Sequence, residues 1–109
     1  MEKTFTQKVI ETVKKIPSGR VMSYAQVAAL SGSERAARAV GHILHNLQDL
    51  ASVPWHRVIS SKGYITTTCK EHTYITQKQL LEKEGVEVIW DEKKRMYWVD
   101  MKRYNILKF

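Results

Sequence analysis

Apolar residues in the first half of the chain recur every three or four positions, the spacing of one face of an α-helix. This pattern predicts a helix over residues 5–16. Thr4 and Gln7 form a capping-box sequence at its start, and Ser23 and Gln26 repeat this sequence before a second helix. Both starts are therefore marked by side chains able to bond the free backbone N–H groups of a first helical turn.

The second predicted helix stops at Gly32, and Ser33 opens a third that runs from Glu34 to about Asn46. Two helices joined by a short turn containing glycine are typical of a helix-turn-helix. We therefore expect such a unit over about residues 24–46.

The second half of the chain changes pattern. Residues 53–59 are an apolar segment expected to cross the core, and residues 64–75 form a threonine-rich loop. A fourth helix is predicted from Thr76 to Glu84, closed by Gly85. Alternating apolar residues around a charged turn then predict a hairpin over about residues 86–99.

Together these elements predict a mostly α-helical fold with a small β-hairpin, in a winged-helix-like arrangement. The 109 residues are expected to form one domain, 1–109. The formal net charge is +7, and both halves of the chain share the excess. A basic domain indicates a polyanionic partner, with nucleic acid as the first candidate, although charge also serves solubility.

Composition removes several classes of protein. No long apolar run or signal-peptide pattern is present, so an intracellular, cytoplasmic protein without a membrane partner is expected. The one cysteine, Cys69, excludes an internal disulfide and a cysteine-based metal cluster. The four histidines have no zinc-site spacing, and we expect neither metal nor cofactor.

The third predicted helix is rich in small residues from Ala36 to Gly41, with Arg35 and Arg38 beside them. Small side chains let a helix backbone approach another surface closely. That surface is either an external partner or a neighbouring helix in the core, and the helix alone does not decide between them.

Residues Pro54-Trp55-His56-Arg57-Val58 resemble the Pro-Cys-His-Arg-Val signature of the O6-alkylguanine-DNA alkyltransferases. Trp55 stands where that family has its nucleophilic cysteine. Three further segments support the resemblance and follow the order of the family: Pro17-Ser18-Gly19-Arg20-Val21 with Ser23-Tyr24, Ala37-Arg38-Ala39-Val40-Gly41, and Glu84-Gly85.

The resemblance implies the fold of the C-terminal domain of these enzymes but not their reaction. A thiolate attacks an alkyl carbon, whereas an indole is no nucleophile at neutral pH. The chain is therefore similar to the alkyltransferase-like proteins, which sense alkylated DNA without repairing it. Such a protein must extrude the damaged nucleotide, at a cost of roughly a few kcal/mol.

The family pattern also assigns roles in DNA binding. Arg38 corresponds to the arginine that fills the gap left by the flipped nucleotide, and its planar guanidinium suits stacking on bases. Tyr24 corresponds to the tyrosine that presses on the backbone beside that nucleotide. Ala36 and Ala37 allow the helix close entry into the minor groove.

The lesion pocket implied by the resemblance is lined by five residues: Tyr24, Trp55, Val58, Ser61 and Thr68. His56 and Glu84 resemble the groups that deprotonate the cysteine in true transferases. With no nucleophile to activate, they are expected to be a structural remnant of that relay that holds the pocket segment. The family's arginine at position 57 ties the same segment to neighbouring backbone.

The leading hypothesis is a monomeric, non-enzymatic sensor of O6-alkylguanine in double-stranded DNA. The resemblance implies nucleotide excision repair proteins as further partners. One alternative is a residual alkyltransferase that uses another nucleophile, such as Cys69 in the divergent loop. Another is a helix-turn-helix regulator that reads undamaged sequence in the major groove.

Overall fold

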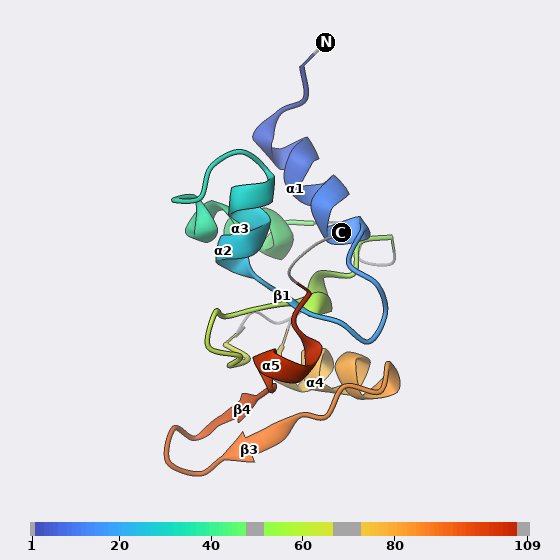
Figure 1. The fold of residues 1–109 in the computed structure, drawn as a ribbon, viewed down its shortest axis with the longest axis vertical. Coiled ribbons are helices and arrows are strands. Elements are labelled where there is room, and N and C mark those ends of the chain that lie inside the picture. Colours follow the sequence, from blue (N-terminus) through green and yellow to red (C-terminus); the bar gives the residue numbers. More distant parts are fainter. Residues whose placement is uncertain (1, 48–51, 67–72, 107–109) are drawn as a thin grey trace.

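The computed structural model describes residues 2–47, 52–66 and 73–106, and Figure 1 shows their arrangement. Helices and short strands alternate along the chain. In order they are α1 (Phe5–Lys14), β1 (Met22–Ser23), α2 (Tyr24–Leu30), α3 (Ala37–His45), the 3₁₀-helix η1 (Trp55–Arg57), β2 (Val58–Ile59), α4 (Tyr74–Lys83), β3 (Ile89–Asp91), β4 (Met96–Trp98) and α5 (Met101–Tyr104).

The two predicted capping boxes are confirmed. Thr4 Oγ1 accepts a hydrogen bond from the backbone N–H of Gln7 at 3.1 Å, and the N–H of Thr4 donates to Gln7 Oε1 at 2.9 Å. Ser23 and Gln26 make the same reciprocal pair at the start of α2. These local bonds satisfy orphan N–H groups and set where both helices begin.

The predicted start of the third helix is wrong. Residues 34–35 form a turn, in which the N–H of Ala36 donates to the carbonyl of Ser33 at 3.1 Å. Helix α3 then begins at Ala37, and its N-cap residue Ala36 offers no side-chain hydrogen bond. Ser33 therefore opens a turn and not a helix.

The fourth helix begins at Tyr74, two residues before the predicted Thr76, because Thr73 Oγ1 caps it by accepting from the N–H of Thr76 at 3.1 Å. The predicted hairpin is confirmed, although its strands β3 and β4 occupy only part of the predicted range of about 86–99. The sequence pattern did not predict helix α5.

A parallel pairing that the sequence analysis did not predict joins the two halves of the chain. Strands β1 and β2 lie side by side, with Met22 opposite Val58 and Ser23 opposite Ile59. Beyond β1, Val21 pairs with Asn105. The start of α2 is thereby fixed to the segment predicted to carry the pocket.

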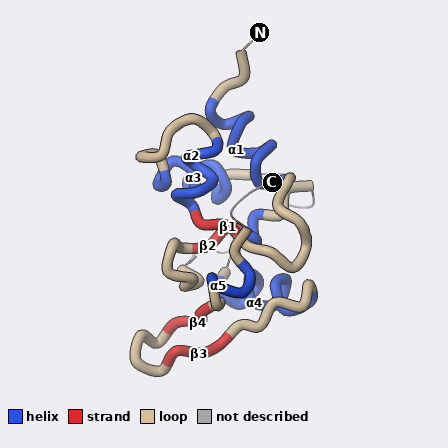
Figure 2. Tube along the Cα trace, viewed as in Figure 1, coloured by secondary structure: helices blue, strands red, loops and turns tan. Residues whose placement is uncertain are grey.

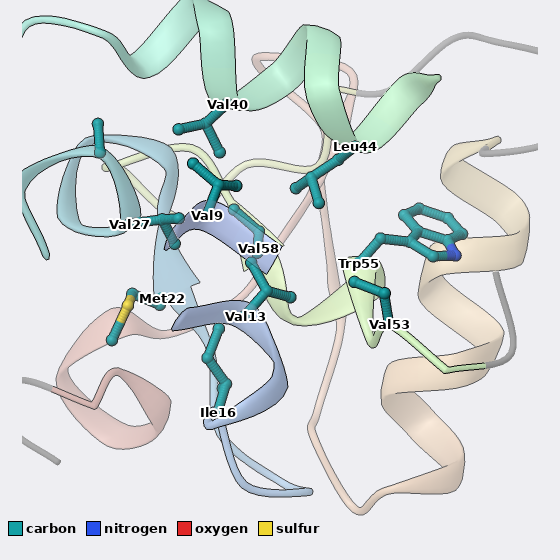
Figure 3. Packing of buried hydrophobic residues seen from close by; sticks show 11 residues of the cluster. Val9, Val13, Ile16, Met22, Val27, Val40, Leu44, Val53, Trp55 and Val58 are labelled. Atoms are coloured by element: carbon teal, nitrogen blue, oxygen red, sulfur yellow. The ribbon is translucent and has the colours of Figure 1, made fainter. Parts of the chain in front are cut away.

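Two buried clusters form the core. The larger joins α1, α2 and α3 to the segment before β2, and Figure 3 shows its side chains. The smaller lies among β2, α4, α5 and the hairpin. The molecule measures 47 × 29 × 23 Å, with α1–α3 towards one end of its long axis and the hairpin at the other (Figures 1 and 2). Within the described residues, no helix is long and apolar enough to cross a membrane.

Candidate functional site

Trp55 lies in η1, directly after Pro54. Its backbone N–H donates to the carbonyl of Val53 at 2.7 Å, and the residue is 6% exposed. Figure 3 shows the indole beyond Val53 and Leu44, extending towards α4. The ring is part of the larger core cluster and also borders a depression, whose lining is Lys14, residues 52–57 and Leu80.

The two residues after Trp55 enter one polar network with Glu84 at the end of α4. His56 Nε2 lies 2.8 Å from Glu84 Oε2, and Arg57 Nη2 donates to that same oxygen at 2.7 Å. The N–H of Gly19 donates to Glu84 Oε1 at 3.2 Å. Arg57 Nη1 also donates to the carbonyl of Ile16 at 2.7 Å, which ties the segment to backbone as the family pattern implied.

Hydrogen-bond donors and burial together set the ionisation of Glu84 and His56 in this network. Burial opposes ionisation of Glu84, but hydrogen bonds from Arg57, His56 and Gly19 outweigh it and lower the pKa of the carboxyl to about 2. Burial lowers the pKa of His56, against the opposing effect of Glu84. A neutral His56 therefore lies beside an ionised Glu84 at neutral pH, and the network can hold the backbone of η1 without a further partner.

Gln77 is a structural residue of the site that the sequence analysis missed. Its side chain is 1% exposed and donates from Nε2 to the carbonyls of His56 and Val58, at 3.0 and 2.9 Å. These bonds satisfy two carbonyls at the point where η1 becomes β2. The sequence did contain one signal: Gln77 lies four residues before Leu81, a spacing that places its amide on the same, inward face of the helix.

Tyr24 is the first residue of α2 and packs, half-buried, against the larger cluster. A Cβ placed on Gly41 would lie 4.0 Å from Tyr24 Cε1, so the tyrosine ring lies beside the middle of α3. The pairing of Ser23 with Ile59 also holds it near the end of β2. Tyr24 and Trp55 thus belong to one packed unit.

Helix α3 presents a basic face. Arg38, His42 and His45 are all exposed and lie at helical spacing, whereas Val40 and Leu44 point into the core. Its first turn has no acidic residue and no side-chain cap. In the described chain every other α-helix has a capping side chain, so the N–H groups at the start of α3 are the ones left for an external acceptor.

The remaining predicted site residues are less closely grouped. Ala36 and Ala37 are half-buried at the start of α3. Val58 is fully buried in the cluster that contains Trp55. Ser61 is exposed and borders a different depression, with Trp98 and Met101 among its lining residues. Thr68, Cys69 and His72 lie outside the described residues. No group of three metal-ligating side chains occurs in the described segments.

A helix-turn-helix with exposed basic residues is joined through a short parallel pairing to a Trp-His-Arg segment whose Trp55 and His56 are buried. This arrangement defines the class as a helix-turn-helix DNA-binding domain of the alkyltransferase type. A model of the 6-O-methylguanine DNA methyltransferase DNA-binding domain matches residues 4–86. The chain belongs to this family.

Similar proteins include a DNA base-flipping protein, an alkyltransferase-like protein and a methyltransferase. The DNA base-flipping protein of Escherichia coli is 40% identical over 104 residues, which are 95% of this chain and 75% of that protein. Schizosaccharomyces pombe Atl1, solved with damaged DNA containing O6-carboxymethylguanine, superposes with a TM-score of 0.88 at 33% identity, covering 98% of this chain and all of that one. The Mycobacterium tuberculosis O6-methylguanine methyltransferase gives 0.66 at 33% identity, over 77% of this chain and 50% of the enzyme.

Proposed function

We propose that the protein binds O6-alkylguanine in duplex DNA, flips the damaged nucleotide, transfers no alkyl group, and marks the lesion for nucleotide excision repair. It acts as a monomer inside the cell. Support for lesion binding comes from the S. pombe relative, whose structure contains DNA with O6-carboxymethylguanine. Support for flipping comes from the name of the E. coli relative.

The contact with DNA is made by α3 in the minor groove. Exposed Arg38 lies in the first turn, beside backbone N–H groups that suit a phosphate oxygen. Ala36 and Ala37 add little bulk between the helix and the groove. Arg38 fills the place of the extruded nucleotide, while Tyr24, at the start of α2, meets the backbone beside it.

The observation that carries the absence of transfer is Trp55 within an otherwise complete network. His56, Arg57 and Glu84 are joined by hydrogen bonds, yet an indole occupies the position of the family's cysteine. Removing a proton from this indole would create no useful nucleophile. The network holds η1 in place, and the indole contributes apolar surface, worth about 25 cal/mol per Å² buried, to a bound alkyl group.

The test is a paired titration at one stated salt concentration. One duplex carries a single O6-methylguanine, and the other carries guanine at the same position. The expected result is tighter binding to the lesion with no added mass on the protein. Incision of the lesion duplex by a reconstituted excision nuclease should then increase when the protein is added.

Other outcomes identify the alternatives. Added mass that disappears in a Cys69→Ser variant would establish a residual transferase. Equal affinity for both duplexes, combined with preference among undamaged sequences, would establish a regulator that reads bases in the major groove.

A further inference from the structure

Helix α4 lies against the segment that carries Trp55, and Gln77 binds the backbone of that segment. The residue is 1% exposed, and its Nε2 donates to the carbonyl of His56 at 3.0 Å and to that of Val58 at 2.9 Å. Burying a polar side chain this deeply is costly unless it is hydrogen-bonded. An apolar residue would fill the same space without that requirement, so the amide at this position indicates a need for its two N–H donors.

The segment that receives these bonds is short and irregular. η1 is a single turn of 3₁₀-helix, a form whose hydrogen bonds have poorer geometry than those of an α-helix. Strand β2 has two residues and, in the described chain, pairs with β1 alone. The carbonyls of His56 and Val58 lie on either side of the point where η1 becomes β2. Gln77 therefore fixes the backbone at this junction.

Glu84 acts on the same segment in a different way. Its carboxylate binds the side chains of His56 and Arg57, and rotatable side-chain bonds separate those groups from the backbone. Gln77 binds the carbonyl oxygens themselves, with no rotatable side chain of the segment in between. The Glu84 network therefore anchors the segment, and Gln77 sets the position of its backbone.

The indole of Trp55 takes its position from this backbone. Trp55 opens η1, and its carbonyl accepts the N–H of Val58, whose own carbonyl Gln77 holds. Figure 3 shows the indole extending towards α4, the helix that carries Gln77. A shift of η1 relative to α4 therefore moves the ring directly. A binding site loses selectivity when the residues behind its lining leave it about 1 Å too loose.

We propose that Gln77 is a positioning residue for the recognition of alkylated guanine, which fixes the indole of Trp55 where an O6-alkyl group meets it. Gln77 is buried and acts through Trp55, not through a contact with DNA. The inference rests on the proposed function and deepens it, because it assigns part of the preference for the lesion to a residue of α4. The contact of α3 with DNA does not involve Gln77, so affinity for undamaged duplex is independent of it.

The test compares Gln77→Met with the parent protein. Methionine keeps the length of glutamine but has no donor for the two carbonyls. Both proteins are titrated at one salt concentration with the O6-methylguanine duplex and the guanine duplex, and the measured quantity is the ratio of the two affinities. We expect Gln77→Met to lower this ratio about fivefold, the factor that corresponds to one ordinary hydrogen bond, and to leave affinity for the guanine duplex unchanged. Partial unfolding would lower both affinities by one factor and cancel in the ratio.

Further variants separate the donors from the packing. Gln79→Met makes the same replacement at an exposed position of α4 and should keep the parent ratio. Gln77→Lys retains a nitrogen with at least two N–H donors and should recover part of the lost ratio. If Gln77→Met does not fold, Gln77→Leu, which also lacks donors, provides the comparison.

A second readout follows the position of the indole itself. The indole N–H signal of Trp55, measured by NMR without DNA and with Trp98 as the reference, should move in Gln77→Met and stay in place in Gln79→Met. This signal reports on the ring and not on the affinity for DNA, so it tests whether Gln77 acts through Trp55.

The proposal is overturned if the donor-free variants of Gln77 keep the parent ratio, or if Gln79→Met lowers the ratio equally. It is also overturned if the ratio falls while the Trp55 signal stays in place, or if Gln77→Lys recovers nothing, since packing and not the donors would then set the ratio. A parent protein that binds both duplexes equally would instead remove the proposed function, and with it the preference that Gln77 supports.

Discussion

Arg38 is exposed to solvent and lies in the first turn of α3. If it fills the gap left by a flipped nucleotide, Arg38→Ala removes a contact made with any duplex. We expect affinity for lesion and guanine duplexes to fall together by about 1–3 kcal/mol, the range for an arginine that contacts bases. Fluorescence anisotropy on both duplexes measures this, with Lys83→Ala as the control. Unchanged affinity of Arg38→Ala would remove the assigned role.

Trp55 serves both the core and the proposed pocket, so its replacement has two separable effects. Trp55→Ala should lower the free energy of unfolding by about 3–5 kcal/mol, because it leaves a cavity in the larger cluster. It should also reduce the preference for large O6-alkyl groups over methyl. Trp55→Phe keeps much of the packing and should show an intermediate preference. An unchanged preference in both folded variants would mean that the indole is a core residue only.

The pKa of His56 gives the fold a pH dependence with a defined sign. Because burial lowers this pKa below its ordinary value of 6.5, the unfolded chain takes up the proton first as the pH falls. The contribution of His56 to the free energy of unfolding is therefore fully present above pH 6.5 and is lost as the pH falls below it. The lowered pKa of Glu84 acts in the same direction, with its contribution lost as the pH falls from 4.5 through about 2.

Urea denaturation at a series of pH values checks this sign. His56→Gln, which can still donate to Glu84, should flatten the decrease just below pH 6.5, while the exposed control His42→Gln should keep it. A parent-like slope in His56→Gln would assign the pH dependence to another group.

At the scale of single elements, the uncapped start of α3 offers a position where one substitution should stabilise the helix and weaken DNA binding. Ala37→Glu places a carboxylate where N–H groups point outward, and should stabilise the helix by about 0.3–1 kcal/mol. It should also weaken DNA binding and reduce the slope of log affinity against log salt by about 0.9, the loss of one phosphate contact. Gln79→Glu makes the same charge change on exposed α4 and should leave the slope unchanged. Equal slopes for the two variants would contradict phosphate binding at this helix end.

The elements that could be predicted from the sequence are those fixed by neighbours in the chain. The capping boxes at Thr4 and Ser23 join residues three positions apart, so the sequence pattern contains both partners. Ser33 was misleading because the same residue type also opens turns, and only the bond from Ala36 distinguishes the two. The pairing of Met22 with Val58 joins residues far apart, and strands of two residues have no detectable alternation.

Some residues of the candidate site could likewise be assigned from the sequence, and others could not. The Trp-His-Arg segment and Glu84 could be assigned by resemblance to a known family. Gln77 could not, because its role depends on which backbone carbonyls α4 happens to cover.

At the scale of the whole molecule, Asn105 joins the C-terminal region to the start of α2. Its Nδ2 donates to the carbonyl of Val21 at 3.0 Å and to Gln26 Oε1 at 2.8 Å. Val21 and Gln26 keep their bonds from the backbone N–H groups of Ile106 and Ser23, so Asn105→Ala removes two hydrogen bonds without orphaning an acceptor. At about 0.5–1.5 kcal/mol for each bond, it should lower the free energy of unfolding by about 1–3 kcal/mol. Asn46→Ala removes an exposed bond to His42 and should have a smaller effect. If chemical denaturation gave equal losses for Asn105→Ala and Asn46→Ala, the hydrogen bonds of Asn105 would add no more stability than an exposed bond within one helix.

The parallel pairing of β1 with β2 also has a consequence for how the protein folds. It aligns Ser23, one residue before Tyr24, with a strand that directly follows Trp55 and its network. Because both strands come from distant parts of the chain, no fragment limited to the helix-turn-helix can assemble the pocket. The backbone amides of this pairing should therefore exchange with deuterium only through global unfolding, and the ability to recognise damage should appear and vanish in one cooperative step.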